Sequence, residues 1–162
     1  MDINTLIEKH RMSKELNVKA IFASLFIIQN KLQTTFDKSD PEITLKQFLL
    51  LIMVKQSDEQ LTLTQLGVLL GCSRQNVKKL AVSLEKKGFI RIIKTKEDIR
   101  GLTVESTGKL AHYFNKIEEK HGEMLALLFR DYSEAEITQL FQLLVKLYGG
   151  LERIEEYVKK HQ

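Results

Sequence analysis

Two glycines, Gly71 and Gly88, divide the segment from Leu61 to Glu105 into two short helical stretches and a strand-like one. Glycine ends helices readily because it adopts the left-handed conformation without steric cost. Ser73, a preferred N-cap residue, follows Gly71 almost at once, so a second helix is expected directly after the first one. This spacing predicts two helices joined by a tight turn and followed by a β-hairpin.

The first of these helices has a clear start signal. Thr62 and Gln65 are spaced as in a capping box, in which each side chain accepts a hydrogen bond from the backbone N–H of the other residue. The apolar stripe expected of this helix consists of Leu66, Leu69 and Leu70. Gly67 is expected on the side where the second helix approaches closely.

The second helix is expected to run from Ser73 to about Lys87 and to have two different faces. Its apolar residues recur at spacings of three and four and face the core: Val77, Leu80, Ala81 and Leu84. The opposite face is polar and largely basic: Gln75, Lys78, Lys79, Val82 and Lys86, with Arg74 near the helix start. Gln reads adenine with two hydrogen bonds, Lys contacts guanine or phosphate, and a Val methyl group contacts thymine. This face therefore predicts contacts to duplex DNA.

After Gly88 the pattern moves towards the period of two that is typical of strands. Residues 89–95 and 102–105 are rich in Ile, Val and Thr, and the charged, turn-forming run 96–101 separates them. An Arg at such a tip, held by a neighbouring Asp, suits a narrow minor groove, where the negative potential is deepest. Asp98 and Arg100 are the pair that the sequence offers for this contact.

Basic charge is concentrated in the same segment. Between Cys72 and Arg100 there are nine Lys or Arg and three Asp or Glu, a net charge of +6, whereas the whole chain is only +4. On an isolated helix such a run indicates no more than a solvated face, but here the caps, turn, basic helix and hairpin arrive in the order that a DNA-binding motif requires. We predict a mainly α-helical chain with a small β-hairpin, a winged helix-turn-helix fold. The candidate DNA-binding residues are Ser73, Arg74, Gln75, Asn76, Lys78, Lys79, Lys86, Lys94, Lys96, Asp98 and Arg100.

Two stretches within this segment, SRQNVKKLAVSLEKKGFI and DIRGLTVEST, resemble the recognition helix and the wing of the MarR family of transcriptional regulators. The resemblance implies that Arg100 inserts into the minor groove and that Asp98 braces it. It also implies one long helix before the reading part and two after it. Ser106 stands where the family commonly has Leu, and a glycine follows Thr107 directly. We therefore expect the junction between the wing and the next helix to differ slightly.

The flanking segments predict helices that pair with a second chain. Ser133 and Glu136 form another capping box, after which Leu and Ile residues recur with a heptad period. The expected homodimer interface consists of Ile137, Leu140, Leu144, Leu147, Leu151 and Ile154. We interpret residues 1–162 as a single domain, with the reading part at about 44–105 and dimerisation helices at about 4–36 and 107–161. Gly149 and Gly150 lie within the last helix and indicate either a kink or a close crossing.

Between the first long helix and the reading part, the sequence predicts a polar link at 37–43, which contains Pro41. A capping box formed by Thr44 and Gln47 then predicts a short helix that ends near Lys55.

Composition argues against the other broad classes of protein. With 43% hydrophobic and 28% charged residues, the 162-residue chain has an ordinary globular composition, and we expect a cytoplasmic protein because neither a signal peptide nor an 18-residue apolar run is present. The glycine loop, HExxH and CxxC motifs are absent, so we predict no enzyme, cofactor or metal. Two alternatives stay open: His112 or His121 with a neighbouring Glu as part of a metal sensor, and Cys72 as an oxidisable thiol instead of a packing residue.

The sequence as a whole predicts a homodimeric transcriptional regulator that binds a pseudo-palindromic operator in double-stranded DNA and does not bind membranes. The family resemblance implies repression that is released by a small amphipathic or phenolic effector or by a stress signal. The alternative is a winged-helix protein-interaction module without DNA readout. The two differ in whether reversing the charge of the basic helix face abolishes binding to nucleic acid.

Overall fold

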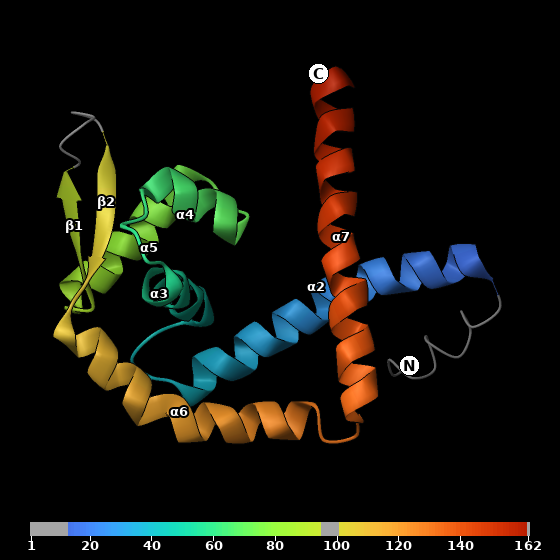
Figure 1. Cartoon of the computed structure of the whole chain (residues 1–162), viewed down its shortest axis with the longest axis horizontal. Helices are drawn as coiled ribbons and strands as arrows, with labels where there is room; N and C mark the ends of the chain where they lie inside the picture. The colour runs from blue at the N-terminus through green and yellow to red at the C-terminus, as the bar shows by residue number, and fades with distance from the viewer. Residues whose placement is uncertain (1–12, 95–100, 162) are drawn as a thin grey trace. The chain divides into compact units, whose positions relative to one another are not determined.

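The computed structural model describes residues 13–94 and 101–161, which form six helices and one two-stranded sheet (Figure 1). This confirms the predicted class, mainly α-helical with a small β-hairpin. The elements are α2 (Lys14–Ser39), α3 (Leu45–Gln56), α4 (Leu63–Leu70), α5 (Arg74–Lys86), β1 (Ile90–Lys94), β2 (Leu102–Ser106), α6 (Gly108–Leu128) and α7 (Glu134–His161). The chain divides into two compact units, one ending at His112 and the other beginning at Tyr113.

The first described helix ends later than the sequence predicts. α2 continues to Ser39 instead of ending at Phe36, so part of the predicted link is the last helical turn. The backbone N–H of Asp40 donates to the carbonyl oxygen of Phe36 at 3.0 Å, and Pro41 then stops the helix. The predicted start near Asn4 lies outside the described residues.

Capping boxes start α3 and α4 at the predicted positions. The backbone N–H of Thr44 donates to Oε1 of Gln47 at 3.1 Å, and the reciprocal bond from the backbone of Gln47 to the Thr44 hydroxyl is also present. Thr62 and Gln65 form the same pair of bonds at the start of α4, at 2.8 and 3.1 Å. Local side-chain chemistry therefore sets where these two helices begin.

The hairpin pairs in one antiparallel register, with Ile92 opposite Val104. On its other side β2 pairs with the segment before α4, through a bridge between Thr62 and Thr103 and a 3.0 Å hydrogen bond from the Val104 N–H to the Leu61 carbonyl oxygen. β2 is therefore the inner strand of this small sheet, and β1 is its edge.

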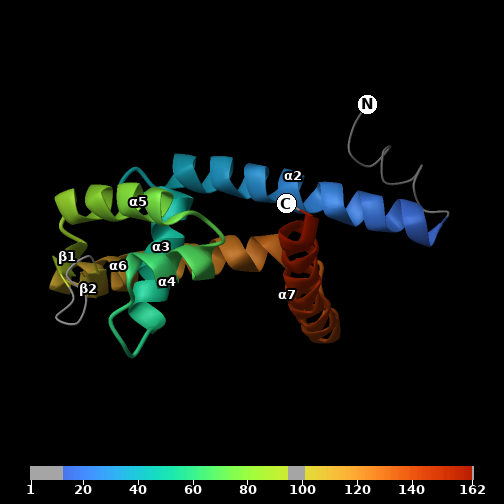
Figure 2. The ribbon, with the colours of Figure 1, turned by 90° about the horizontal axis from the view of Figure 1, so that it is seen from above.

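The core of the first unit gathers α3, α4 and α5 beside the hairpin, while α2 runs on beyond them (Figures 1 and 2). Among the residues with no exposed surface are Leu50, Leu51, Leu66, Val77, Ala81, Leu84 and Phe89. The placement of Leu69 in the apolar stripe of α4 is wrong: its side chain is 55% exposed, and Leu63, at 1%, is buried instead. Residues 63, 66, 67 and 70 share one helical face by their spacing, and Leu69 lies outside that arc.

The second unit contains most of α6 and all of α7, which starts as the sequence predicts. The Glu136 carboxylate accepts hydrogen bonds from the backbone N–H and the hydroxyl of Ser133, both at 2.8 Å. Both hydrogen bonds lower the pKa of Glu136, the one from the Ser133 backbone N–H more than the one from the Ser133 hydroxyl. α7 then runs through Gly149 and Gly150 to His161, and none of its residues is buried in the described chain.

Candidate nucleic-acid interface

The turn between α4 and α5 depends on close approach at Gly67. A Cβ atom at this position would lie 2.8 Å from the carbonyl oxygen of Cys72, so a larger residue does not fit without a backbone shift. Gly71 ends α4 with a left-handed φ of 62°. The hydroxyl of Ser73 then accepts a hydrogen bond from the Asn76 N–H at 3.3 Å and caps α5. The turn thereby fixes the direction in which α5 leaves α4.

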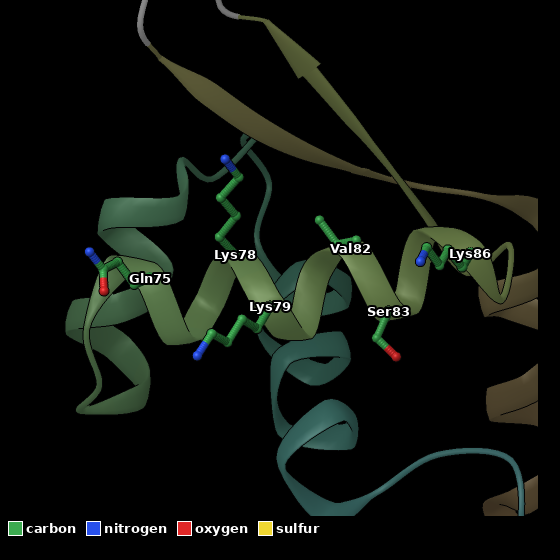
Figure 3. A pocket seen from close by; sticks show the side chains of 6 residues that line it. All are labelled: Gln75, Lys78, Lys79, Val82, Ser83 and Lys86. Carbon is green, nitrogen blue, oxygen red and sulfur yellow. The ribbon is translucent and has the colours of Figure 1, made fainter.

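α5 divides into a buried face and an exposed face, as its sequence predicts. Val77, Ala81 and Leu84 have no exposed surface, whereas Leu80 is only half-buried. On the outer side an open groove of about 560 Å³ is lined by Gln75, Lys78, Lys79, Val82, Ser83 and Lys86. Figure 3 shows these side chains following one another along α5, with Lys78 and Val82 on one edge and Lys79 and Ser83 on the other.

The other candidates at the start of the helix, Ser73, Arg74 and Asn76, are exposed in the first turn of α5 or at its cap. The structure therefore brings together the candidates that come from the turn and from α5. Ser83 is the one groove residue that the sequence prediction missed, because its side chain gives no charge signal.

Gln47 of α3 and Lys87 at the end of α5 attach α5 to the rest of its unit. The side-chain amide of Gln47, which is buried, donates from Nε2 to the Ser83 hydroxyl at 2.9 Å. Its Oε1 accepts from Nζ of Lys87 at 3.0 Å, and the same ammonium donates to the Glu42 carbonyl oxygen at 2.7 Å. Lys87 counted towards the basic surplus in the sequence, but its ammonium is bonded within the protein.

A network at the start of α6 joins the hairpin to the segment before α3. Nζ of Lys109 lies 2.8 Å from the Glu42 carboxylate, donates to the Lys87 carbonyl oxygen at 3.0 Å and lies 4.3 Å from the centre of the Phe89 ring. The Thr107 hydroxyl donates to the Gly88 carbonyl oxygen at 2.7 Å. Nothing in the sequence pattern predicts this network, because its interacting residues lie between 19 and 67 positions apart in the chain.

The hairpin adds basic residues next to α5. Arg91 and Lys94 on β1 are exposed. The predicted tip residues Lys96, Asp98 and Arg100 lie outside the described residues, so their role in a minor groove stays a prediction.

Other chemical sites give weaker signals. Within residues 13–94 and 101–161 no three His, Cys, Asp or Glu side chains gather in a way that could hold a metal ion. Cys72 is a half-buried free thiol. None of the described helices combines the length and the apolarity needed to cross a bilayer.

Comparison with known proteins points to one family. The family model of the MarR family matches residues 42–101. The chain is 28% identical to the transcriptional repressor MprA of Escherichia coli (strain K12) over 107 residues, which are 66% of this chain and 61% of MprA. It therefore spans less than two thirds of the length of that relative.

Solved structures share the fold. The transcriptional regulator SlyA superimposes with a TM-score of 0.75 at 21% identity, over 85% of this chain and 98% of SlyA. The MepR–DNA complex of S. aureus gives a TM-score of 0.70 at 22% identity, over 80% of this chain and 97% of MepR.

Proposed function

We propose that the chain is a sequence-specific DNA-binding transcriptional regulator of the MarR family, whose family model matches residues 42–101. The observation that carries the proposal is the groove of α5. Gln75, Lys78, Lys79 and Lys86 line it, while Val77, Ala81 and Leu84 on the opposite side of the same helix have no exposed surface. A helix held in this way presents its hydrogen-bonding side chains rigidly. The major groove of DNA is wide enough to admit such a helix.

In the proposed complex, α5 lies in the major groove. Gln75 has the amide needed to pair with adenine, and Lys79 reaches guanine or phosphate. Arg91, Lys94 and Lys96 contact the phosphates. Arg100, braced by Asp98, enters the adjacent minor groove. Phosphate contacts of this kind supply affinity, and the contacts of α5 supply the sequence preference.

We further propose that the DNA-bound form is a homodimer on a pseudo-palindromic operator. The predicted interface residues of α7 remain accessible in the described chain: Ile137, Leu144 and Leu147 are about 40% exposed, and Leu151 and Ile154 exceed 50%. A row of apolar side chains at heptad spacing is the pattern by which two copies of a helix pair. A two-fold dimer would place two recognition helices about 10 base pairs apart.

The direction of regulation belongs to the same proposal. The related protein MprA is named a transcriptional repressor, which supports repression as the function of this chain. Repression of this kind is released in the MarR family by a small amphipathic or phenolic effector, and we propose the same class of signal here. The protein would act in the cytoplasm, where its operator is located.

The experiment that tests DNA reading starts from a random duplex library. All 162 residues of the chain are used to select bound fragments, and the enriched duplex is then titrated in a mobility-shift assay. We expect Gln75→Ala with Lys79→Ala to weaken binding to that duplex by roughly 1 to 3 kcal/mol per lost base contact, with the folded state unchanged.

The control is Lys159→Ala, which removes a positive charge from the last turn of α7 and is expected to leave affinity for the duplex nearly unchanged. If the double variant binds the duplex as tightly as the wild type, α5 is not the reading helix. If no duplex is enriched and charge reversal along the groove has no effect on nucleic acid, the chain is a winged-helix interaction module instead.

A further inference from the structure

Glu85, near the end of α5, holds the strand that follows it. Its Oε1 accepts a hydrogen bond from the backbone N–H of Ile92 at 2.7 Å. Its main-chain carbonyl oxygen accepts from the Gly88 N–H at 2.9 Å. One residue of the helix therefore fixes both the corner at Gly88 and the middle of β1.

The position of Ile92 gives this bond its importance. β1 is the edge of the described sheet, and alternate N–H groups of an edge strand face away from the neighbouring strand. Glu85 provides a side-chain oxygen that accepts from one of them, so this N–H has a partner within the chain. Arg91 and Lys94, on the same strand, are placed relative to α5 by this attachment.

The charge of Glu85 is unfavourable where it stands. Residues 72–94 contain seven Lys or Arg and one acid, which is Glu85. A carboxylate next to a phosphate-binding surface repels the phosphates, so its charge works against DNA affinity. The bond to Ile92 supplies a physical reason for a side chain of this length that ends in an acceptor oxygen.

We propose that Glu85 is a positioning residue for DNA recognition. By holding the Ile92 backbone it sets the angle between α5 and the hairpin, so that both reach the same duplex at once. The inference rests on the proposed function, since it concerns how the DNA-binding surface is assembled.

Two substitutions separate the hydrogen bond from the charge. Glu85→Asp keeps the charge but shortens the side chain by one methylene, so the carboxylate no longer reaches Ile92. Glu85→Gln removes the charge but keeps an oxygen at the same distance. We expect Glu85→Asp to bind the selected duplex roughly ten-fold more weakly, and Glu85→Gln to bind it at least as tightly as the wild type. An effect of charge alone also predicts tighter binding by Glu85→Gln, but it predicts no change in Glu85→Asp, so the Asp variant separates the two explanations.

Amide hydrogen exchange at Ile92 reports the bond without DNA. We expect faster exchange at Ile92 in Glu85→Asp than in Glu85→Gln, and no difference at Val104, which donates to Leu61. The control for charge is Asp58→Asn, in the loop between α3 and α4. In the Glu85 variants, weaker binding to the duplex must accompany faster amide exchange at Ile92. If the affinity for the duplex changes without a change in that exchange rate, or the reverse, the proposal is overturned. The titration of the wild-type chain comes first. If the wild type binds no duplex, the proposed function itself is contradicted, and this result is distinct from any difference between the variants.

Discussion

α5 and α7 are both amphipathic helices, but the described chain covers the apolar side of only one of them. α5 has 13 residues and buries Val77, Ala81 and Leu84 completely. α7 has 28 residues and buries none. The shorter helix is therefore stabilised by its own unit, whereas the longer one keeps an apolar row that residues 13–94 and 101–161 leave accessible.

The two helices differ in the contacts that hold them in place. α5 must present a rigid polar face, so its apolar face is packed and its ends are fixed by Ser73 and by the bonds of Gln47 and Lys87. α7 carries no comparable polar site, and its starting turn is held by local bonds only. If a second chain covers α7, its stability depends on protein concentration, while that of α5 does not.

The largest effect is expected from charge in the row of α7. Leu147→Glu with Leu151→Glu should prevent pairing and give a monomer or an unfolded chain, because two carboxylates cannot be buried unpaired in an apolar interface. A dimer with micromolar affinity corresponds to about 8 kcal/mol, most of which this variant should remove. Sedimentation at micromolar concentration measures the change.

Gln139→Glu with Gln142→Glu is the matched control, since it adds the same charge to α7 outside the heptad row. It should still sediment as a dimer. A wild-type chain that sediments as a monomer and protects only one half-site would contradict both the dimer and the palindromic operator.

A smaller effect is expected from the core side of α5. Leu84→Ala should lower the free energy of unfolding by about 2 to 5 kcal/mol, because it leaves a cavity at a fully buried position. Urea denaturation at two protein concentrations measures it. The loss in free energy of unfolding caused by Leu84→Ala should be the same at both protein concentrations, because Leu84 packs within its own unit. Leu147→Ala in α7 should instead shift the urea midpoint more at the lower protein concentration. Equal behaviour of the two variants would remove the distinction between the helices.

The turn before α5 should be less sensitive. Gly67→Ala is expected to destabilise the protein by about 1 to 3 kcal/mol, since the added methyl group would lie 2.8 Å from a backbone carbonyl oxygen. Gly108→Ala is the control, because nothing lies within 4 Å of a Cβ atom there. Thermal unfolding of both variants tests this, and equal midpoints would mean that α4 and α5 can separate slightly without cost.

The parts of the fold that short-range chemistry determines could be predicted from the sequence. Thr62, Ser73 and Gly71 act on groups within four residues of themselves, and the helix boundaries around them agree with the expectation. Leu69 is misplaced because the prediction starts the apolar stripe at Leu66; the spacing of residues 63, 66 and 70 excludes Leu69 once Leu63 is included. The late end of α2 has a different cause: helix continuation and a polar link use the same residue types.

The candidate site was predictable to the same extent. The groove residues of α5 follow from helical periodicity and charge. The inward ammonium of Lys87, the junction at Lys109 and the bond of Glu85 to Ile92 could not be predicted, because charged side chains look alike in sequence whether they face solvent or the chain. Such bonds depend on tertiary geometry.

The smallest effect concerns the start of α7 and its dependence on pH. The hydrogen bonds from the Ser133 N–H and hydroxyl hold the pKa of Glu136 below its ordinary value of 4.5. Because the folded-state pKa is lowered, the capping box stabilises the helix above pH 4.5 and loses this contribution as pH falls through the folded-state value. Glu136→Gln should therefore lower the thermal midpoint slightly at pH 7 and leave it unchanged at low pH. Glu134→Gln removes an equal charge from the same turn and serves as the control. If both variants give the same pH profile, the charge near the N-terminus of α7 matters and the Ser133 bonds do not.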